Sequence, residues 1–299
     1  MSRTPDSPAA HARPVPVPIP LQAGIGLRFP HHQAVLCGEA KAAWFEVHPE
    51  NYLDAAVEVL ERVRADRPVS LHATGLSLGS FEGVDEDHLS RIADLAARIE
   101  PGLISDHLSW SVTGGTYLPD LLPVPCTDEV LDVFARNVDR VQAVLKRPIL
   151  VENPSAYLAY ADSAMEEGEF LAALVARSGC GVLLDVNNVA VSAANLGGDA
   201  GTRLAALMDR VPAAAIGEIH LAGHAVRTLE DGTMVRIDDH GSPIGAEVWS
   251  LFETAIRRIG ARPTLIEWDT AIPPFAALAR EAAMADLLMA AGEEHHAAA

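Results

Sequence analysis

The segment LKRPILVENP at residues 145–154 contains the end of a predicted helix and then a complete predicted strand. A proline at position 148 stops a stretch of helical periodicity, and an apolar run of aliphatic and β-branched residues follows at 149–151. That run ends in Glu152 and Asn153. The order of helix, breaker, buried strand and polar strand end is typical of parallel strands that are connected by helices.

The same pattern recurs along the whole chain. Eight short apolar runs lie at 24–27, 44–47, 69–71, 103–105, 149–151, 182–184, 216–219 and 264–266. Helical periodicity separates most of them, at 54–65, 86–99, 128–145, 166–177, 201–210, 246–259 and 275–290. Since eight strands can close into a barrel, the sequence predicts an α/β fold of the (β/α)8 or TIM-barrel type. Chemistry in that fold sits at the carboxyl ends of the strands, where the long excursions 109–127 and 221–243 also lie.

Length and composition favour one barrel domain at residues 21–291. The chain has 299 residues, of which 49% are hydrophobic, so it can bury one large core. Residues 1–20 contain six prolines and no apolar run typical of a secretion signal, and we expect a disordered leader there. Residues 292–299 are expected to form a flexible tail. No apolar stretch approaches the roughly 20 residues of a membrane span.

The charge balance limits the partners of the protein. A formal net charge of -19 repels polyanions, so nucleic acid is not expected, and a small, peptidic or positively charged ligand is favoured. The three cysteines, Cys37, Cys126 and Cys180, are widely spaced and form neither a CxxC pair nor a dense disulfide framework. This usage suits a reducing compartment, and we expect a cytoplasmic protein.

Polar side chains stand at the ends of seven of the eight predicted strands. Carboxylates that converge on one barrel mouth repel one another, and divalent cations remove that conflict. The available ligands are nitrogen and oxygen donors without thiolate, which suits two or three ions of zinc, manganese or ferrous iron. The residues are Glu46, His48, His72, Asp106, His107, Glu152, Asn153, Asp185, Asn187, Asn188, Glu218, His220 and Glu267, and the loop after strand seven adds Asp238 and His240.

Some single positions keep two interpretations. Asp106 and His107 are adjacent, so they cannot both point into the barrel; one is a ligand and the other supports it. His31 and His32 could line the mouth but are weaker candidates, because a lone histidine is more often structural. We expect His88 and the pair at 295–296 to be solvated.

The strand-end residues resemble those of the endonuclease IV and xylose isomerase superfamily of barrels. The resemblance implies three metals. A strand-three His, a strand-four residue and a bridging strand-five Glu hold the first, and strands six to eight hold the second. A residue after strand six and an Asp-x-His hold the third. Carried over, the ligands are His72, Asp106 or His107, Glu152, Asp185, His220, Glu267, Asn188, Asp238 and His240. The nuclease has His where this chain has Asn188, which predicts a looser third site or one suited to iron.

Longer motifs extend the resemblance. They are WFEVHPENY at 44–52, SDHLSW at 105–110, LLPVP at 121–125, VENPSAY at 151–157, LLDVNN at 183–188, EIHLAGH at 218–224 and IEWD at 266–269. Together they resemble the multinuclear non-haem iron-dependent oxidase family, which includes the methanobactin biosynthesis oxidase. The resemblance covers about residues 24–281, and asparagine is the residue expected at position 188.

This resemblance implies an iron enzyme that uses dioxygen to modify cysteines of a ribosomally synthesised precursor peptide, beside a partner protein that recognises the peptide leader. Two or three iron ions are implied. Glu152, Asp185, His220 and Glu267 would hold the central ion, with His48, His72 and Asp106 holding its neighbour through bridging Glu152. Asn188, Asp238 and His240 would hold the third.

Within this set, the catalytic residues are expected to be Glu152, His220, Asp238 and His240, together with His224. The residues expected to orient the ligands are Glu46, Asn51, Asn153 and Asn187. The alternatives on the same barrel are a zinc or manganese hydrolase or isomerase and a non-catalytic metal-binding scaffold.

Overall fold

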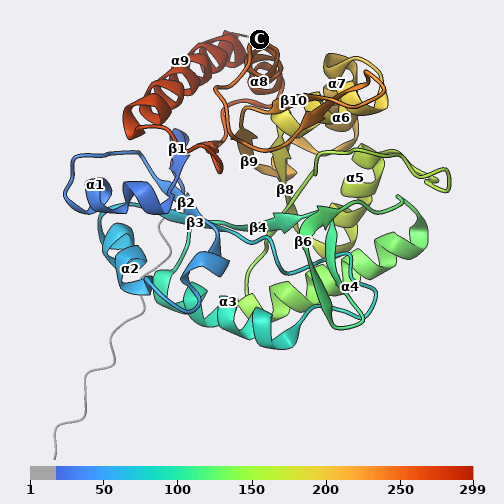
Figure 1. The fold of residues 1–299 in the computed structure, drawn as a ribbon, viewed down its shortest axis with the longest axis horizontal. Helices are drawn as coiled ribbons and strands as arrows, with labels where there is room; N and C mark the ends of the chain where they lie inside the picture. Colours follow the sequence, from blue (N-terminus) through green and yellow to red (C-terminus); the bar gives the residue numbers. More distant parts are fainter. Residues whose placement is uncertain (1–17, 299) are drawn as a thin grey trace, which may run out of the picture.

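Eight parallel strands close into a barrel at the centre of the protein (Figure 1). In this computed structural model the backbone is described for residues 18–298 and the side chains for residues 18–292. The order around the barrel is β1-β12-β9-β8-β7-β4-β3-β2, so the first and last strands pair and no edge stays open. The predicted (β/α)8 fold is confirmed. The strands are β1 (Ala23–Gly26), β2 (Phe45–Val47), β3 (Val69–His72), β4 (Ile104–His107), β7 (Leu150–Glu152), β8 (Gly181–Asp185), β9 (Ile216–Leu221) and β12 (Thr264–Ile266).

Helices surround the barrel and pack their apolar faces against it (Figure 1). They are α1 (His32–Leu36), α2 (Val57–Asp66), α3 (Glu86–Ile99), α4 (Asp128–Leu145), α5 (Glu167–Ser178), α6 (Val186–Leu196), α7 (Ala200–Arg210), α8 (Ala246–Ile259) and α9 (Phe275–Ala298). Short 3-10 turns add η1 (Phe29–His31), η2 (Pro49–Tyr52) and η3 (Ala213–Ala215). Of the helices that the structure describes, none has the length and apolar composition needed to cross a bilayer.

Helix α6 is absent from the sequence prediction, because it begins in the residue that follows β8 without an intervening turn. Its N-cap is Asp185, whose carboxylate accepts a hydrogen bond from the backbone N–H of Asn188 at 2.6 Å. The last residue of a barrel strand is therefore also a helix cap. Asn187 and Asn188, which follow it, are thereby fixed in the first helical turn.

The two ends of the domain differ from the expected boundaries. Residues 1–17 of the predicted leader lie outside the described residues. Ile19, however, is 8% exposed and packs with Trp44 and Leu265, so the packed chain begins before residue 21. At the other end, α9 continues to Ala298, and the segment 292–298 expected in a flexible tail is helical.

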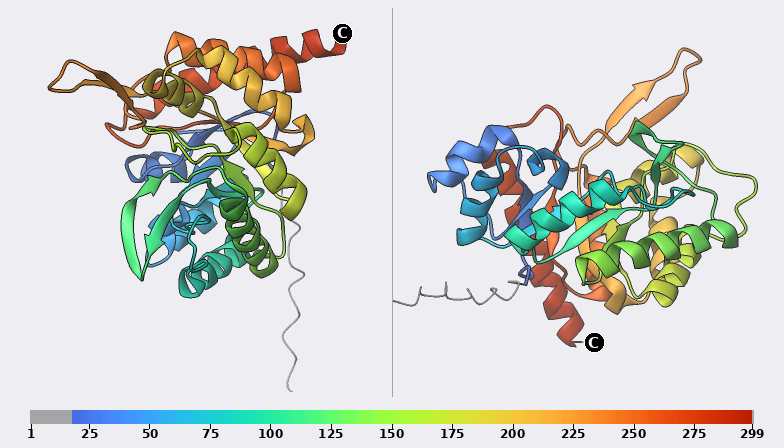
Figure 2. Two further views of the ribbon diagram at one scale, coloured as in Figure 1. Left: turned by 90° about the vertical axis from the view of Figure 1, so that its right-hand side faces the viewer. Right: turned by 90° about the horizontal axis from the view of Figure 1, so that it is seen from below.

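The two long excursions contain antiparallel hairpins that the sequence pattern did not predict. β5 (Trp110–Thr113) pairs with β6 (Thr116–Leu122), and β10 (Ala225–Thr228) pairs with β11 (Met234–Ile237). Both hairpins project from the same side of the barrel, opposite the C-terminal end of α9 (Figure 2). Because one follows β4 and the other follows β9, they flank the end of the barrel where the strands finish.

Candidate metal centre

Six ionisable side chains form one buried layer inside the mouth of the barrel. Each lies within one residue of the end of a different strand, and none is more than 5% exposed. Alternate residues of a strand point to opposite faces, so the last inward-facing residue of each strand meets the others at one level. The six residues are His72, His107, Glu152, Asp185, His220 and Glu267.

On one side of the layer two imidazoles converge on one carboxylate oxygen. Oε2 of Glu152 lies 3.2 Å from Nε2 of His72 and 3.3 Å from Nε2 of His107. The two Nε2 atoms are 3.1 Å apart. The Oγ of Ser105, one turn of the pleat below His107, contacts Nδ1 of His72 at 2.8 Å and so fixes the plane of that ring.

The structure separates the adjacent residues Asp106 and His107. His107 points into the barrel, whereas Asp106 points outward and accepts hydrogen bonds from the backbone N–H groups of Leu76 and His107. The alternation along β4 causes this, because Ser105 and His107 share the inner face. The placement therefore favours His107 as the residue that faces a metal, in contrast to the role given to Asp106 from the resemblance.

On the other side of the layer His220, Asp185 and Glu267 come together. Nδ1 of His220 lies 3.0 Å from Oε2 of Glu267, and ligand atoms of the three residues all lie within 4.8 Å of one another. One carboxylate oxygen of Asp185 caps α6, which leaves Oδ2 turned toward the layer.

Asp238 and His240 reach the same place from the loop between β9 and α8. Nε2 of His240 lies 2.7 Å from Oδ1 of Asp238, and its Nδ1 lies 3.5 Å from Oε2 of Glu267. Asn188 is placed differently: its Nδ2 donates to Oε1 of Glu152 at 3.0 Å and to the Asn153 carbonyl at 3.0 Å. Asn188 therefore links the expected third site to Glu152.

Several buried polar atoms at this mouth have no hydrogen-bond partner among the described residues. They include Oε2 of Glu152, Oδ2 of Asp185, Oδ1 of Asn188 and Nε2 of His220. Such atoms cost free energy unless an ion, a proton or water satisfies them. Burial raises the pKa of Glu152 to about 8 and that of Asp185 to about 7, which measures the cost of ionising them here. The donor set of imidazole, carboxylate and carboxamide fits divalent metals.

A second polar layer lies deeper in the barrel, below His220. Oε1 of Glu46 is 3.2 Å from Nε2 of His220, and Oε1 of Glu218 is 3.8 Å from it. The other oxygen of Glu46 accepts from Ser70 at 2.6 Å. Burial and the neighbouring Glu46 raise the pKa of Glu218 to about 8. Glu46 thus lies where it can orient His220, and Glu218, which the sequence pattern offered as one of the strand-end polar residues, lies in this deeper layer.

Arg28 is a further residue of the mouth that sequence reasoning missed, and its partner Asp269 belongs to the polar end of strand eight that the sequence pattern indicated. Nε of Arg28 donates to Oδ1 of Asp269 at 2.6 Å, and its Nη2 lies 3.4 Å from Glu267. His48 also turns toward this group, since its Nε2 is 3.6 Å from Asp269 while its Nδ1 contacts the backbone oxygen of His72. The positions of Arg28 and Asp269 in the sequence could have indicated this place, because Asp269 is the last residue of the IEWD motif and Arg28 follows β1.

The residues expected to orient the ligands are not all at the mouth. Asn153 exchanges two hydrogen bonds with the backbone of Asp185, and Asn187 donates to Asp238 at 2.7 Å. Asn51 is exposed on η2. His224, expected to be catalytic, is half-buried. Its Nδ1 lies 2.7 Å from Oδ1 of Asn187, which is not itself a member of the buried layer.

The remaining histidines with described side chains lie outside the layer. His31 bonds to the Pro273 carbonyl, and His32 bonds to the Tyr52 hydroxyl. The prediction that His88 is solvated is wrong, because its Nε2 lies 3.3 Å from a half-buried carboxylate, that of Glu50. The pair at 295–296 lies outside the residues whose side chains are described.

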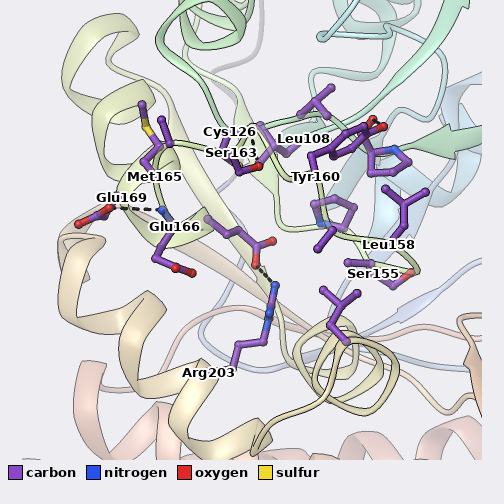
Figure 3. Close-up of a pocket in the computed structure, with 18 residues that line it drawn as sticks. Leu108, Cys126, Ser155, Leu158, Tyr160, Ser163, Met165, Glu166, Glu169 and Arg203 are labelled. Atoms are coloured by element: carbon purple, nitrogen blue, oxygen red, sulfur yellow. Dashed lines mark hydrogen bonds and ion pairs between the residues drawn. The ribbon is translucent and has the colours of Figure 1, made fainter.

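A cavity of about 470 Å³ lies among the loops that follow β4 and β7 (Figure 3). Its wall begins at Leu108, the residue after His107, and continues along the loop after β7. Two hydrogen bonds connect the loops on either side: Tyr160 donates to the Pro123 carbonyl at 3.0 Å, and Ser163 accepts from the backbone of Cys126 at 3.1 Å. The lining combines apolar and polar side chains, and it includes the ion pair of Glu167 and Arg203.

Comparison with known sequences places the chain in a family. Residues 22–290 match the family described as RiPP precursor modification enzyme MbnB/TglH/ChrH. The chain belongs to this family. Similar proteins include a UPF0276 protein of Caulobacter vibrioides, 49% identical over 274 residues, which cover 91% of this chain and 96% of the relative. A UPF0276 protein of Vibrio vulnificus is 47% identical over 275 residues, which cover 91% and 93% of the two chains.

Solved structures share the fold of the barrel. Endonuclease IV from Thermus thermophilus aligns with a TM-score of 0.56 at 17% identity, over 88% of this chain and 98% of the nuclease. L-ribulose 3-epimerase aligns with a TM-score of 0.60 at 14% identity, over 91% and 96% of the chains. At such identities the likeness shows the xylose isomerase-like fold alone.

Replacement of the two adjacent β4 residues will separate a metal-facing residue from a supporting one. His107→Ala removes an imidazole from the layer, so we expect loss of at least one bound metal ion per chain. Asp106→Asn keeps an acceptor for a backbone N–H, so metal affinity should fall by about 10 to 100-fold without loss of the site. Elemental analysis after anaerobic equilibration with ferrous iron measures both.

His32→Ala is the matched control, since His32 lies outside the layer and the variant should keep its full metal content. Full metal in His107→Ala, together with loss in Asp106→Asn, would exchange the two assignments.

Proposed function

We propose that this protein is an oxidase with two or three iron ions at the barrel mouth, which uses dioxygen to modify cysteine residues of a ribosomally synthesised precursor peptide. One observation carries the proposal. This chain belongs to a family of precursor-modifying enzymes, and its barrel mouth contains a buried layer of nitrogen and oxygen donors, several of which have no hydrogen-bond partner. That layer contains no cysteine, so sulfur ligation is left to the substrate.

The ligand sets follow the two sides of the layer. Asp185, His220, Glu267 and Glu152 would hold the central ion, and His72 with His107 would hold its neighbour through Glu152. Asp238 and His240, with Asn188, would hold a third. When bound, iron would supply an open position for a cysteine thiolate and electrons for the reduction of dioxygen.

Glu152 is the residue on which this arrangement depends. Asn188 donates to Oε1 of Glu152, which leaves Oε2 to face both imidazoles. One carboxylate can thus serve two neighbouring ions. Oxidation of cysteine releases electrons and protons, and dioxygen accepts them and leaves as water or hydrogen peroxide.

His224 is suited to receive a proton from the substrate. Asn187 donates its Nδ2 to Asp238, so its oxygen faces His224 and accepts the Nδ1–H. The lone pair of the His224 ring is then on Nε2. Because His224 is half-buried at the mouth, that nitrogen can act as a base without contact with the ligand layer.

The cavity between the loops that follow β4 and β7 would give a place to the peptide segments that flank the cysteine. Its volume of about 470 Å³ is in the range of small-ligand pockets, and its mixed polar and apolar wall would accept side chains that flank the cysteine. The net charge of -19 favours a peptide with basic residues. We further propose that a partner protein binds the peptide leader and forms a heterodimer with this chain.

Glu152→Gln tests the proposed reaction. The amide replaces the shared oxygen by a donor, so the variant should fold normally, lose at least one metal and lose nearly all activity. Dioxygen consumption would be measured with a cysteine-containing peptide as the substrate, and thermal unfolding and metal content on the same preparation. Glu129→Gln, at an exposed position in the first turn of α4, is the control.

Normal turnover and full metal content in Glu152→Gln would remove Glu152 from the centre. A wild-type protein that holds zinc, ignores the peptide and cleaves phosphodiesters would instead support a hydrolase.

Substitution in the cavity should separate peptide binding from metal binding. Ala159→Trp places a large ring in the lining, and we expect peptide affinity to fall by roughly 5 to 100-fold, the equivalent of about 1–3 kcal/mol of overpacking, with metal content unchanged. Ala161→Trp lies in the same exposed loop outside the lining and should bind peptide normally. Isothermal titration with the precursor peptide measures both, and equal affinities would place the peptide elsewhere.

A further inference from the structure

Asp238 and His240 differ from the other members of the centre in how they are held. The others belong to strand ends or to the first turn of α6, whereas these two lie in the loop of residues 222–245. That loop also carries the β10–β11 hairpin, which extends away from the barrel (Figure 2). Val226 and Met234 of the hairpin are 57% and 70% exposed, so it packs little on the core. Something else must bring the pair into the centre.

The backbone of His240 shows that its position is imposed. Its φ is 45°, in the left-handed region, which costs a non-glycine residue on the order of 1 kcal/mol or more. The segment after β12 holds it there: the backbone N–H groups of Asp269 and Thr270 donate to the His240 carbonyl at 2.8 and 3.4 Å. Thr270 also donates its hydroxyl to the Asp239 carbonyl at 2.8 Å.

Asp269 holds His240 in a second way, because its side chain also contacts the imidazole ring. Its Oδ2 lies 3.0 Å from Nδ1 of His240. A histidine that donates Nδ1–H to a carboxylate presents the lone pair of Nε2, and that atom lies beside Asp238. Asp269 therefore fixes both the rotation and the tautomer of His240.

Arg28 holds Asp269 from the opposite side. It makes two contacts with Oδ1, from Nε at 2.6 Å and from Nη2, and Nη2 also reaches Glu267. Arg28 is 8% exposed and follows β1, which pairs with β12 where the barrel closes. The guanidinium thus joins the first strand to the segment that grips the loop.

We infer that Arg28 and Asp269 form a clamp that docks the loop pair Asp238 and His240 onto the strand-held part of the centre. Both are positioning residues, since they act through His240. The consequence is that the metal site at this pair assembles separately: without the clamp, the strand-held sites remain and the loop site is lost. The inference rests on the proposed metal centre but requires neither the peptide nor dioxygen.

The test uses Arg28→Met and Asp269→Asn in the full chain, with ferrous iron alone as the probe. We expect each variant to bind one ion fewer than the parent, or to bind one ion about 10 to 100-fold more weakly, with the remaining ions unchanged. Hydrogen exchange of the metal-free protein should be faster in the loop 222–245 and unchanged in the barrel strands. Arg28→Lys keeps the charge but not the two-point contact, so it should restore the site in part.

Arg227→Met, on the exposed β10 strand, is the matched control and should behave as the parent. Unchanged iron binding and unchanged loop exchange in both clamp variants would overturn the inference. Equal weakening of every ion would also overturn it, because the clamp would then support the whole centre. A parent that binds fewer than two ions would contradict the proposed function, and loop exchange in the metal-free variants would still decide the clamp.

Discussion

The burial of several carboxylates beside several imidazoles, at one level inside a closed barrel, is the constraint on which the structure depends. Closure of the sheet forces the inward residues at the strand ends together, and burial makes each charge expensive. Raised pKa values at Glu152, Asp185 and Glu218 express that cost, and unpartnered atoms remain even after the internal hydrogen bonds are made. Under the proposed function, bound cations would satisfy both requirements at once.

The centre combines two kinds of support. Strand ends fix His72, His107, Glu152 and His220 with little freedom, while Asp238 and His240 depend on contacts across the mouth from Asp269 and Arg28. Rigid ligands can hold a pair of ions at a constant spacing, and a docked loop can complete the site beside them. The loops that line the cavity and the two hairpins follow strands at the same end of the barrel, so metal and peptide would meet there under the proposed function.

Much of this was predictable because it follows from local pattern. Breakers, apolar runs and polar strand ends located all eight strands and most of the ligand layer. What failed required long-range geometry or exact register. Whether Asp106 or His107 faces the barrel interior depends on which face of β4 is the inner one, and the sequence does not give that register. Arg28 and Asp269 are 241 positions apart in the chain, so only closure of the barrel brings them into contact. Helix α6 was not predicted because Asp185 is both a strand end and a helix cap. The contact of His88 was not predicted because its partner Glu50 lies 38 residues away in the chain.

The most direct measurement is anomalous diffraction at the iron absorption edge, on crystals grown anaerobically with ferrous iron. The account predicts at least two peaks, one between Glu152 and the imidazoles of His72 and His107, and one among Asp185, His220 and Glu267. A single peak, or none at the mouth of the barrel, would contradict the multinuclear iron centre.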